Sequence, residues 1–200
     1  MIFVDELKKA IDVMLLKNND AKSMSVGGSL AFYYKASLIP LILNVILTVI
    51  MFVALGSVSG GLLGSAGSLL GGAIGILAVV VIIFAYWIVI PLGLLIDAAI
   101  YYVIGRLIGV YKQGYDAAFN GVVYGVMPYI VLSFLAVIPL LGGIIGVIAG
   151  LWALVALVYW LSKMQKTSYV STIVVLVIVL ILIVILLLII GASFLSLLHL

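Results

Sequence analysis

The chain of 200 residues has no cysteine, a single histidine and few charged residues. The absence of cysteine excludes disulfides, thiol nucleophiles and cysteine-ligated metal sites, although it does not identify a compartment. His199 has no ligand-type neighbours in the sequence, so we expect no metal site there. Only 8% of the residues are charged, whereas 68% are apolar. A soluble domain of this size cannot bury so much apolar surface, so we expect the chain to fold in a lipid bilayer.

The first 35 residues form the only sizeable polar region, which we take as a cytoplasmic N-terminal segment. Apolar residues recur in it at helical spacing, which predicts a short amphipathic helix. We expect this helix to lie on the lipid headgroups or to dock on a protein partner. Its candidate contact surface consists of Val4, Leu7, Ile11, Met14, Lys8 and Lys9.

The remainder of the chain, residues 36–200, consists largely of apolar stretches that are long enough to cross a bilayer as helices. The stretch 73–105 would be about 50 Å long as one helix. It must tilt, bend or protrude from a hydrocarbon layer of about 30 Å, and Pro91 offers a bend. The fold class is therefore an all-α, polytopic membrane protein with a bundle of five transmembrane helices. The predicted spans are residues 36–55, 73–105, 118–138, 141–161 and 170–190.

Two glycine-rich patterns bear on how the helices are connected and packed. Residues 56–72 are rich in glycine and serine and carry no charge, so we expect a flexible or interfacial loop. Close helix packing through these glycines is the alternative. In the fourth span, Gly142, Gly146 and Gly150 repeat every four residues, a spacing that lets two helix backbones approach closely. We predict that this face packs helices together, within one bundle or between two copies.

All nine Lys and Arg residues fall on one side of this five-span arrangement. They lie in the N-terminal segment, in the loop 106–117 and in the loop 162–169. Because cytoplasmic segments carry the excess of Lys and Arg, we predict a cytoplasmic N-terminus and a C-terminus that is outside or lumenal. Splitting residues 73–105 at Pro91 into two spans would break this pattern, so we keep one span. The basic residues indicate topology, and no feature indicates a nucleic-acid partner.

Asp97 is the only charged residue of the stretch 73–105 and lies about 13 Å inward from Arg106 along a helix. Counting inward from the cytoplasmic ends of the other spans gives similar depths for polar or aromatic residues. No intramembrane Lys or Arg supplies a counter-charge, so we expect Asp97 to be protonated or strongly hydrogen-bonded. The predicted intramembrane polar cluster consists of Asn44, Asp97, Tyr101, Tyr124, Pro128 and Trp152.

Three interpretations of this cluster stay open. Asp97 can clasp neighbouring spans by hydrogen bonds, it can be a protonatable site in a small transporter or channel, or it can face a water-filled cleft or a partner subunit. Catalysis is not expected, because one intramembrane Asp without His or Lys provides neither a nucleophile with its base nor paired acids. We expect no cofactor either.

The order of several features points to a known family. A long second span is followed by a short polar loop, and the third span carries a Tyr-x-x-x-Pro element from Tyr124 to Pro128. A turn with Pro and Gly at residues 138–143 then leads to the pair Leu151-Trp152. Over roughly residues 36–190 this order resembles the Yip-domain family (Ypt/Rab-GTPase-interacting membrane proteins), and in particular its compact prokaryotic-type members.

The resemblance implies five spans, a cytosolic N-terminus and a lumenal C-terminus. Eukaryotic members of the family act in vesicle trafficking, bind lipidated Rab GTPases and associate with related membrane proteins. This chain departs from them, because its N-terminal segment is short and has no Asp-Leu-Tyr-Gly-Pro motif. The departure argues against binding of a Rab-type GTPase.

Together these observations predict a non-catalytic multi-pass membrane protein, in the cell membrane if the source is prokaryotic. Its expected role is that of a scaffold or adaptor in membrane organisation or trafficking-like processes, acting through protein or lipid contacts. Its expected partners are the lipid bilayer and a second copy or a related membrane protein. The alternative is a small proton- or ion-coupled transporter or channel centred on Asp97.

Overall fold

The computed structural model describes residues 2–17, 23–63 and 65–198, and His199 lies outside this described part. Every regular element in the described part is helical. The elements are α1 (Ile2–Met14), α2 (Val26–Leu63), α3 (Ser65–Phe84), a π-helical turn (Ala85–Val89), α4 (Ile90–Leu107), α5 (Tyr115–Gly125), α6 (Met127–Leu132), a 3₁₀ segment (Ser133–Val137), α7 (Leu141–Met164) and α8 (Tyr169–Leu198).

Five stretches of these helices are long and apolar enough to cross a membrane, which confirms an all-α, five-helix bundle. They are Val26–Leu55, Gly72–Leu107, Tyr115–Val137, Leu141–Met164 and Tyr169–Gly191. Each corresponds to one predicted span. The first begins ten residues earlier than the predicted residue 36. Residues 26–35, which include Lys35, were assigned to the polar N-terminal segment, yet they are already helical. The chain is therefore an integral, multi-pass membrane protein.

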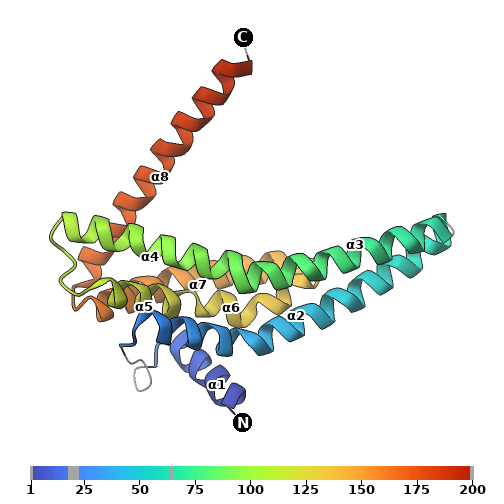
Figure 1. The fold of residues 1–200 in the computed structure, drawn as a ribbon, viewed down its shortest axis with the longest axis horizontal. Coiled ribbons are helices and arrows are strands. Elements are labelled where there is room, and N and C mark those ends of the chain that lie inside the picture. Colours follow the sequence, from blue (N-terminus) through green and yellow to red (C-terminus); the bar gives the residue numbers. More distant parts are fainter. Residues whose placement is uncertain (1, 18–22, 64, 199–200) are drawn as a thin grey trace.

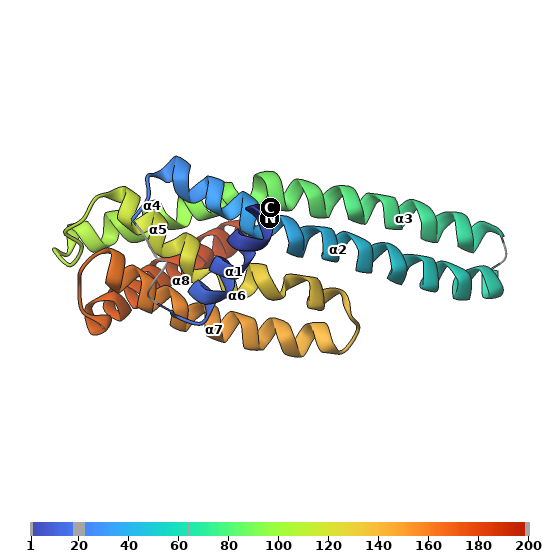
Figure 2. The ribbon, with the colours of Figure 1, turned by 90° about the horizontal axis from the view of Figure 1, so that it is seen from below.

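The glycine-rich segment 56–72 is helical where the structure describes it, so the prediction of a loop is wrong. Helix α2 runs on to Leu63 and α3 begins at Ser65, and the two form a long antiparallel hairpin. At 38 residues, α2 is about 57 Å long. Packing of α2 against α3 along the hairpin supports helix even in this glycine-rich sequence. The hairpin extends beyond the turn between α6 and α7 (Figures 1 and 2).

The main core lies at the end of the bundle that carries the basic residues, and we call this packed region the hub. It joins α1 to the neighbouring parts of α2, α4, α5, α6 and α7. Its largest fully buried side chains include Tyr33, Phe119, Tyr124 and Trp160. The Tyr124 ring meets the rings of Phe32 and Trp160 edge to face, with centroids 5.5 and 5.3 Å away. Such edge-to-face contacts fix the relative rotation of the helices that carry them.

Two glycines of α5 let this helix approach α7 closely. A Cβ atom added to Gly121 would lie 2.9 Å from Cα of Leu161, and one added to Gly125 would lie 2.7 Å from Cα of Leu157. Only glycine permits such backbone contact, so these two residues are the small-residue interface of the bundle. Their spacing of four residues is present in the sequence, but the sequence analysis did not identify it as a signal for helix packing.

Two parts of the chain leave the hub, and we call them arms. One arm is the outer part of the α2–α3 hairpin, and the other is α8 beyond Val179 (Figure 1). Residues 180–191 of α8 are all exposed, and so are most side chains described between residues 72 and 84. Both arms are built almost entirely from aliphatic residues and small residues. They therefore present long apolar surfaces where they cross the membrane.

Helix α1 is docked on the hub. Ala10 and Val13 are fully buried, and Leu7, Ile11 and Met14 pack against the core around them. The predicted apolar surface is thus covered by the bundle, except for Val4, which is 61% exposed. Lys9 lies over the Phe32 ring at 4.9 Å, whereas Lys8 is exposed. The face of α1 that stays free is its charged one.

Candidate functional site: polar groups of the bundle and the Asp97 groove

A bend in the second long span is held by tyrosines of α2. Pro91 cannot donate a backbone hydrogen bond, and the π-helical turn Ala85–Val89 lies just before it. The Tyr33 hydroxyl donates to the carbonyl of Tyr86 over 2.9 Å, and the Tyr34 hydroxyl donates to the carbonyl of Trp87 over 3.1 Å. The carbonyl of Trp87 is the one that Pro91 frees. Two side chains of α2 therefore satisfy carbonyls that the irregular turn leaves exposed.

A second polar group of residues lies nearer the middle of the bundle. The hydroxyls of Tyr86 and Ser133 are hydrogen-bonded to each other. The Asn44 amide donates to the carbonyl of Ser133 over 3.4 Å, and Thr48 donates to Asn44 Oδ1 over 3.4 Å. These bonds connect α2 and the π-helical turn to the 3₁₀ segment, another stretch of irregular backbone. Asn44 also lines a cavity of about 180 Å³ together with Tyr129 and Gly146.

The densest hydrogen bonding is around Asn120, a residue that the sequence analysis did not single out. Asn120 is fully buried in α5 and bonds both backbone groups of Met24, its Nδ2 to the carbonyl at 2.5 Å and its Oδ1 to the N–H at 3.1 Å. It also accepts from Ser29 at 3.0 Å and donates to the carbonyl of Asp116 at 2.6 Å. An amide side chain in the middle of α5, among apolar residues on either side, was the available signal for this connection between α5 and the start of α2.

Asp97 faces a groove on the surface of the bundle. It is exposed, and within the described part of the chain it has no hydrogen bond and no ion pair. The groove has a volume of about 140 Å³ and lies between α4, α5 and α7. Apart from Asp97 and Tyr101 its lining is apolar and includes Gly125 and Gly150. The structure thus leaves a carboxylate on a largely apolar surface, without an ion pair to any described cation.

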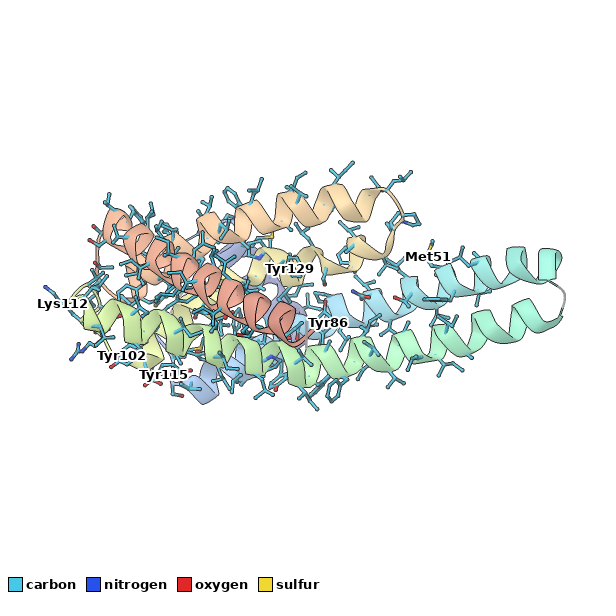
Figure 3. All side chains as sticks on the ribbon, turned by 90° about the horizontal axis from the view of Figure 1, so that it is seen from above. Met51, Tyr86, Tyr102, Lys112, Tyr115 and Tyr129 are labelled. Carbon is cyan, nitrogen blue, oxygen red and sulfur yellow. The ribbon has the colours of Figure 1, made fainter. Side chains whose placement is uncertain are left out.

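Asp97 lies near the basic end of the bundle. The hydroxyl of Tyr115, the first residue of α5, donates to the carbonyl of Leu95 over 2.8 Å. Asp116 accepts from the N–H of Val26, the first residue of α2, over 3.2 Å. Residues next to Asp97 therefore lie beside the first turns of α2 and α5. Figure 3 shows Tyr102, Lys112 and Tyr115 at this end of the molecule, with Tyr86 and Tyr129 near its middle.

The six residues of the predicted polar cluster are consequently in separate places. Asn44 lines one cavity, whereas Asp97 and Tyr101 line another. The physical reason is that α4 continues about three turns past Asp97, beyond the first residues of α2 and α5. Counting depth inward from each helix end assumed that all the ends lie in one plane, and here they do not.

The aromatic and proline residues of that cluster have packing roles. Tyr124 is fully buried in the hub, and Pro128 is buried at the start of α6, where it marks the break after α5. Trp152 is 38% exposed, and its indole N–H donates to the carbonyl of Met14 over 2.7 Å. Trp160 donates likewise to the carbonyl of Val13 over 3.1 Å. The two indoles cap the C-terminal end of α1, whose last carbonyls have no partners within the helix.

The predicted glycine face of α7 is divided as well. A Cβ added to Gly142 would lie 2.1 Å from the carbonyl oxygen of Ala136, so Gly142 is needed for the tight turn after the 3₁₀ segment. A Cβ added to Gly146 or Gly150 would meet no atom within 4 Å. These two glycines therefore pack against no helix of the described chain. They line the two cavities that hold Asn44 and Asp97.

The loop after α4 is fixed to the hub by side chains. Tyr111 is buried against Val175 and Val179 of α8, and burial raises the pKa of its hydroxyl, an effect that the Thr172 side chain partly opposes. Gln165 accepts from the N–H of Gln113 at 3.1 Å and donates to the carbonyl of Gly114 at 3.3 Å. These contacts hold the first turns of α8 against α4, next to the Asp97 groove.

The described side chains of the spans are mainly apolar or neutral hydrogen-bonding groups, and Asp97 adds an exposed carboxylate to the second span. Among the described residues no three His, Cys, Asp or Glu side chains come together in a way that could hold a metal ion. No protein-family model, curated protein or solved structure matches the chain. By its own sequence and geometry, the chain is an integral membrane protein with a packed hub, two apolar arms and an open groove at Asp97.

Proposed function

We propose that this chain is a non-catalytic membrane scaffold that associates, through its transmembrane helices, with a second membrane polypeptide. The observation that carries the proposal is the contrast between hub and arms. The hub is closed by buried aromatic residues and hydrogen bonds, whereas residues 180–191 of α8 and most side chains described between residues 72 and 84 are exposed. Helix faces of this kind are available for packing by other helices within the membrane.

We also propose that the protein is located in the cell membrane and is related to the compact members of the Yip-domain family. The order of sequence features from residue 73 onward supports the relationship, and the clustering of Lys and Arg supports a cytoplasmic basic end. The charged face of α1, which carries Asp5, Glu6, Lys8, Lys9 and Asp12, is the surface that we assign to headgroups or a soluble partner. Its apolar face is already covered by the hub.

The scaffold proposal is tested by the composition of the protein in native membrane. The full chain, carrying a purification tag, is extracted with a polymer that keeps a disc of lipid around it, and the mass of each particle is measured. We expect particles that contain a second membrane polypeptide or a second copy in fixed stoichiometry. Particles that contain only single copies with lipid would contradict the proposal.

A second function, a small proton- or ion-coupled transporter, is favoured by one observation only. Asp97 is a carboxylate in a groove and has no bonding partner in the described chain. The test is flux of protons or of Na⁺ into vesicles that contain the purified protein, compared with Asp97→Asn, which keeps the size of the side chain and removes its charge. If no flux is seen, or if the substitution leaves flux unchanged, this second function is refuted.

A further inference from the structure

We infer that the Asp97 groove binds a transmembrane helix of a partner protein through a Lys or Arg at the cytoplasmic end of that helix. The inference rests on the proposed function and deepens it, because it assigns the surface and the chemistry of the partner. Its starting point is the carboxylate of Asp97, which is exposed in a membrane span without a hydrogen bond or ion pair in the described chain. A carboxylate at such a place is stabilised by an opposite charge.

The described cations on the helices that line the groove contact other groups. Arg106 donates to the carbonyls of Tyr111 and Lys112, at 3.3 Å each. Lys163 lies over the rings of Tyr159 and Trp160, at 5.7 and 5.0 Å. The opposite charge therefore has to come from outside the described chain, and charge complementarity selects an ammonium or a guanidinium group.

The position of Asp97 along the bundle agrees with a cation supplied by the cytoplasmic end of a partner helix. Asp97 lies beside the first turns of α2 and α5, close to the end where the chain concentrates its own basic residues. Transmembrane helices of other proteins carry their Lys and Arg residues at the same side of the membrane. A partner helix that crosses the bilayer in parallel with α4 would place such a flanking residue at the level of Asp97, since long basic side chains reach along the helix toward the interface.

The shape of the groove suits a helix. Gly150 has open space above it, and Ala153 and Leu157 continue the same side of α7. Small residues let an incoming backbone approach closely, which is the usual basis of helix association in lipid. Tyr101, one turn from Asp97 on the same face, adds an aromatic ring close to the position of the incoming cation.

The path of α8 leaves room for this partner. Val175 and Val179 of α8 pack beside Tyr101, and Tyr101 in turn lines the groove. Residues 180–191 of the helix are exposed, and α8 departs from the bundle (Figure 1). A partner helix in the groove would contact α4 and α7, and it would meet the first turns of α8 beside Tyr101.

The test uses the full chain in vesicles of uncharged phosphatidylcholine and two synthetic transmembrane peptides. Both peptides have the same Leu/Ala core, and one carries Lys at its cytoplasmic flank where the other carries Gln. Because the chain has no cysteine, a single Lys112→Cys site takes a donor dye, and energy transfer to an acceptor on the peptide reports association. We expect the Lys peptide to associate at least about tenfold more tightly than the Gln peptide, as for a close charge pair.

The variants make the assignment specific. Asp97→Asn should abolish the preference for Lys, whereas Asp116→Asn, which neutralises an exposed carboxylate outside the groove and keeps an acceptor for the N–H of Val26, should leave it intact. Gly150→Leu should weaken binding of both peptides by filling the groove. The inference is overturned if the peptides bind equally, if neither binds, or if Asp97→Asn retains the preference. It is overturned too if Asp97 instead mediates association between two copies of this chain.

Failure of this test is distinguishable from failure of the proposed function. A fixed stoichiometric complex in lipid discs that is unchanged by Asp97→Asn would retain the scaffold and reject the groove as its contact surface. Asp97→Asn is expected to fold normally, because Asp97 makes no hydrogen bond within the described chain. Its far-ultraviolet circular dichroism and thermal unfolding should match those of the unchanged protein.

Discussion

The hub and the α8 arm lie in the same membrane, yet the hub is tightly packed, whereas residues 180–191 of the α8 arm are exposed. The hub contains glycines at helix contacts, buried aromatic rings and a fully bonded asparagine, Asn120. From Ile173 to Ile190, α8 has no polar side-chain atom at all. Lipid tails are as apolar as Leu or Val, so aliphatic surface alone does not drive helices together in a bilayer. Close backbone packing and hydrogen bonds decide which helices pair, and they are concentrated in the hub.

The strongest test of this comparison is Trp160→Ala. Trp160 is fully buried and its indole donates to the carbonyl of Val13, so the substitution opens a cavity and uncaps α1. We expect a loss of about 3–5 kcal/mol in the free energy of unfolding, measured in bicelles. Trp152→Ala is the matched control, because Trp152 caps the same helix end but is 38% exposed. Equal losses for both would show that burial in the hub is not what matters.

A glycine pair separates the packed face from the open one. Gly125→Ala brings a Cβ to 2.7 Å from Cα of Leu157, whereas Gly150→Ala meets no atom within 4 Å. We expect Gly125→Ala to reduce the free energy of unfolding by about 1–3 kcal/mol through overpacking, and Gly150→Ala to change it by less than about 0.5 kcal/mol. The same unfolding measurement decides, and a larger loss at Gly150 would contradict the assignment of the interface.

Two asparagines compare buried hydrogen bonding in different parts of the bundle. Asn120 makes four bonds of 2.5–3.1 Å, while the two bonds of Asn44 are 3.4 Å long. Asn120→Ala leaves several buried groups without partners and should cost about 2–3 kcal/mol, and Asn44→Ala about 1 kcal/mol or less. Unfolding midpoints of the two variants, recorded side by side, provide the check. A reversed order would mean that the central contacts, not those of the hub, hold α2 in place.

The smallest effects are expected within α8 itself. Val175 is fully buried against Tyr111, whereas Val184 is 47% exposed and lies in the arm. Val175→Ala should lower the free energy of unfolding by about 1 kcal/mol, and Val184→Ala by less than about 0.5 kcal/mol. If Val184→Ala proved as costly as Val175→Ala, the arm would be packed on the bundle in the membrane.

Much of the fold follows from the sequence, because the lengths of the apolar stretches and the positions of the charged residues predict the five spans. Helix α1 was also predictable from the spacing of Leu7 and Ile11. Its docking on the hub was not, because the indoles that cap it come from α7, far away in the chain. The helical state of the described residues between 56 and 72 was missed because the low helix propensity of glycine was considered without the packing of α2 against α3.

The candidate site was predictable in part. The sequence identified Asp97 as the one charge of the stretch 73–105, and in the structure Asp97 lines a groove between α4, α5 and α7. Its distance from Asn44 depends on where each helix begins relative to its neighbours, which the Tyr115 and Asp116 contacts reveal. Gly146 and Gly150 have the spacing of a packing face, yet α5 meets α7 further along the helix, at Leu157 and Leu161.

Disulfide cross-linking in lipid nanodiscs that hold one chain each tests the difference between hub and arm most directly. The chain has no cysteine of its own, so introduced pairs react only with each other. For Gly125→Cys with Leu157→Cys, the Cβ atoms would lie 3.0 Å apart before adjustment, close to the range of about 3.5–4.5 Å found in disulfides. We predict that this pair oxidises readily, while Gly150→Cys with Val184→Cys stays reduced. Rapid cross-linking of the second pair would show α8 closed over the Asp97 groove and would contradict the account.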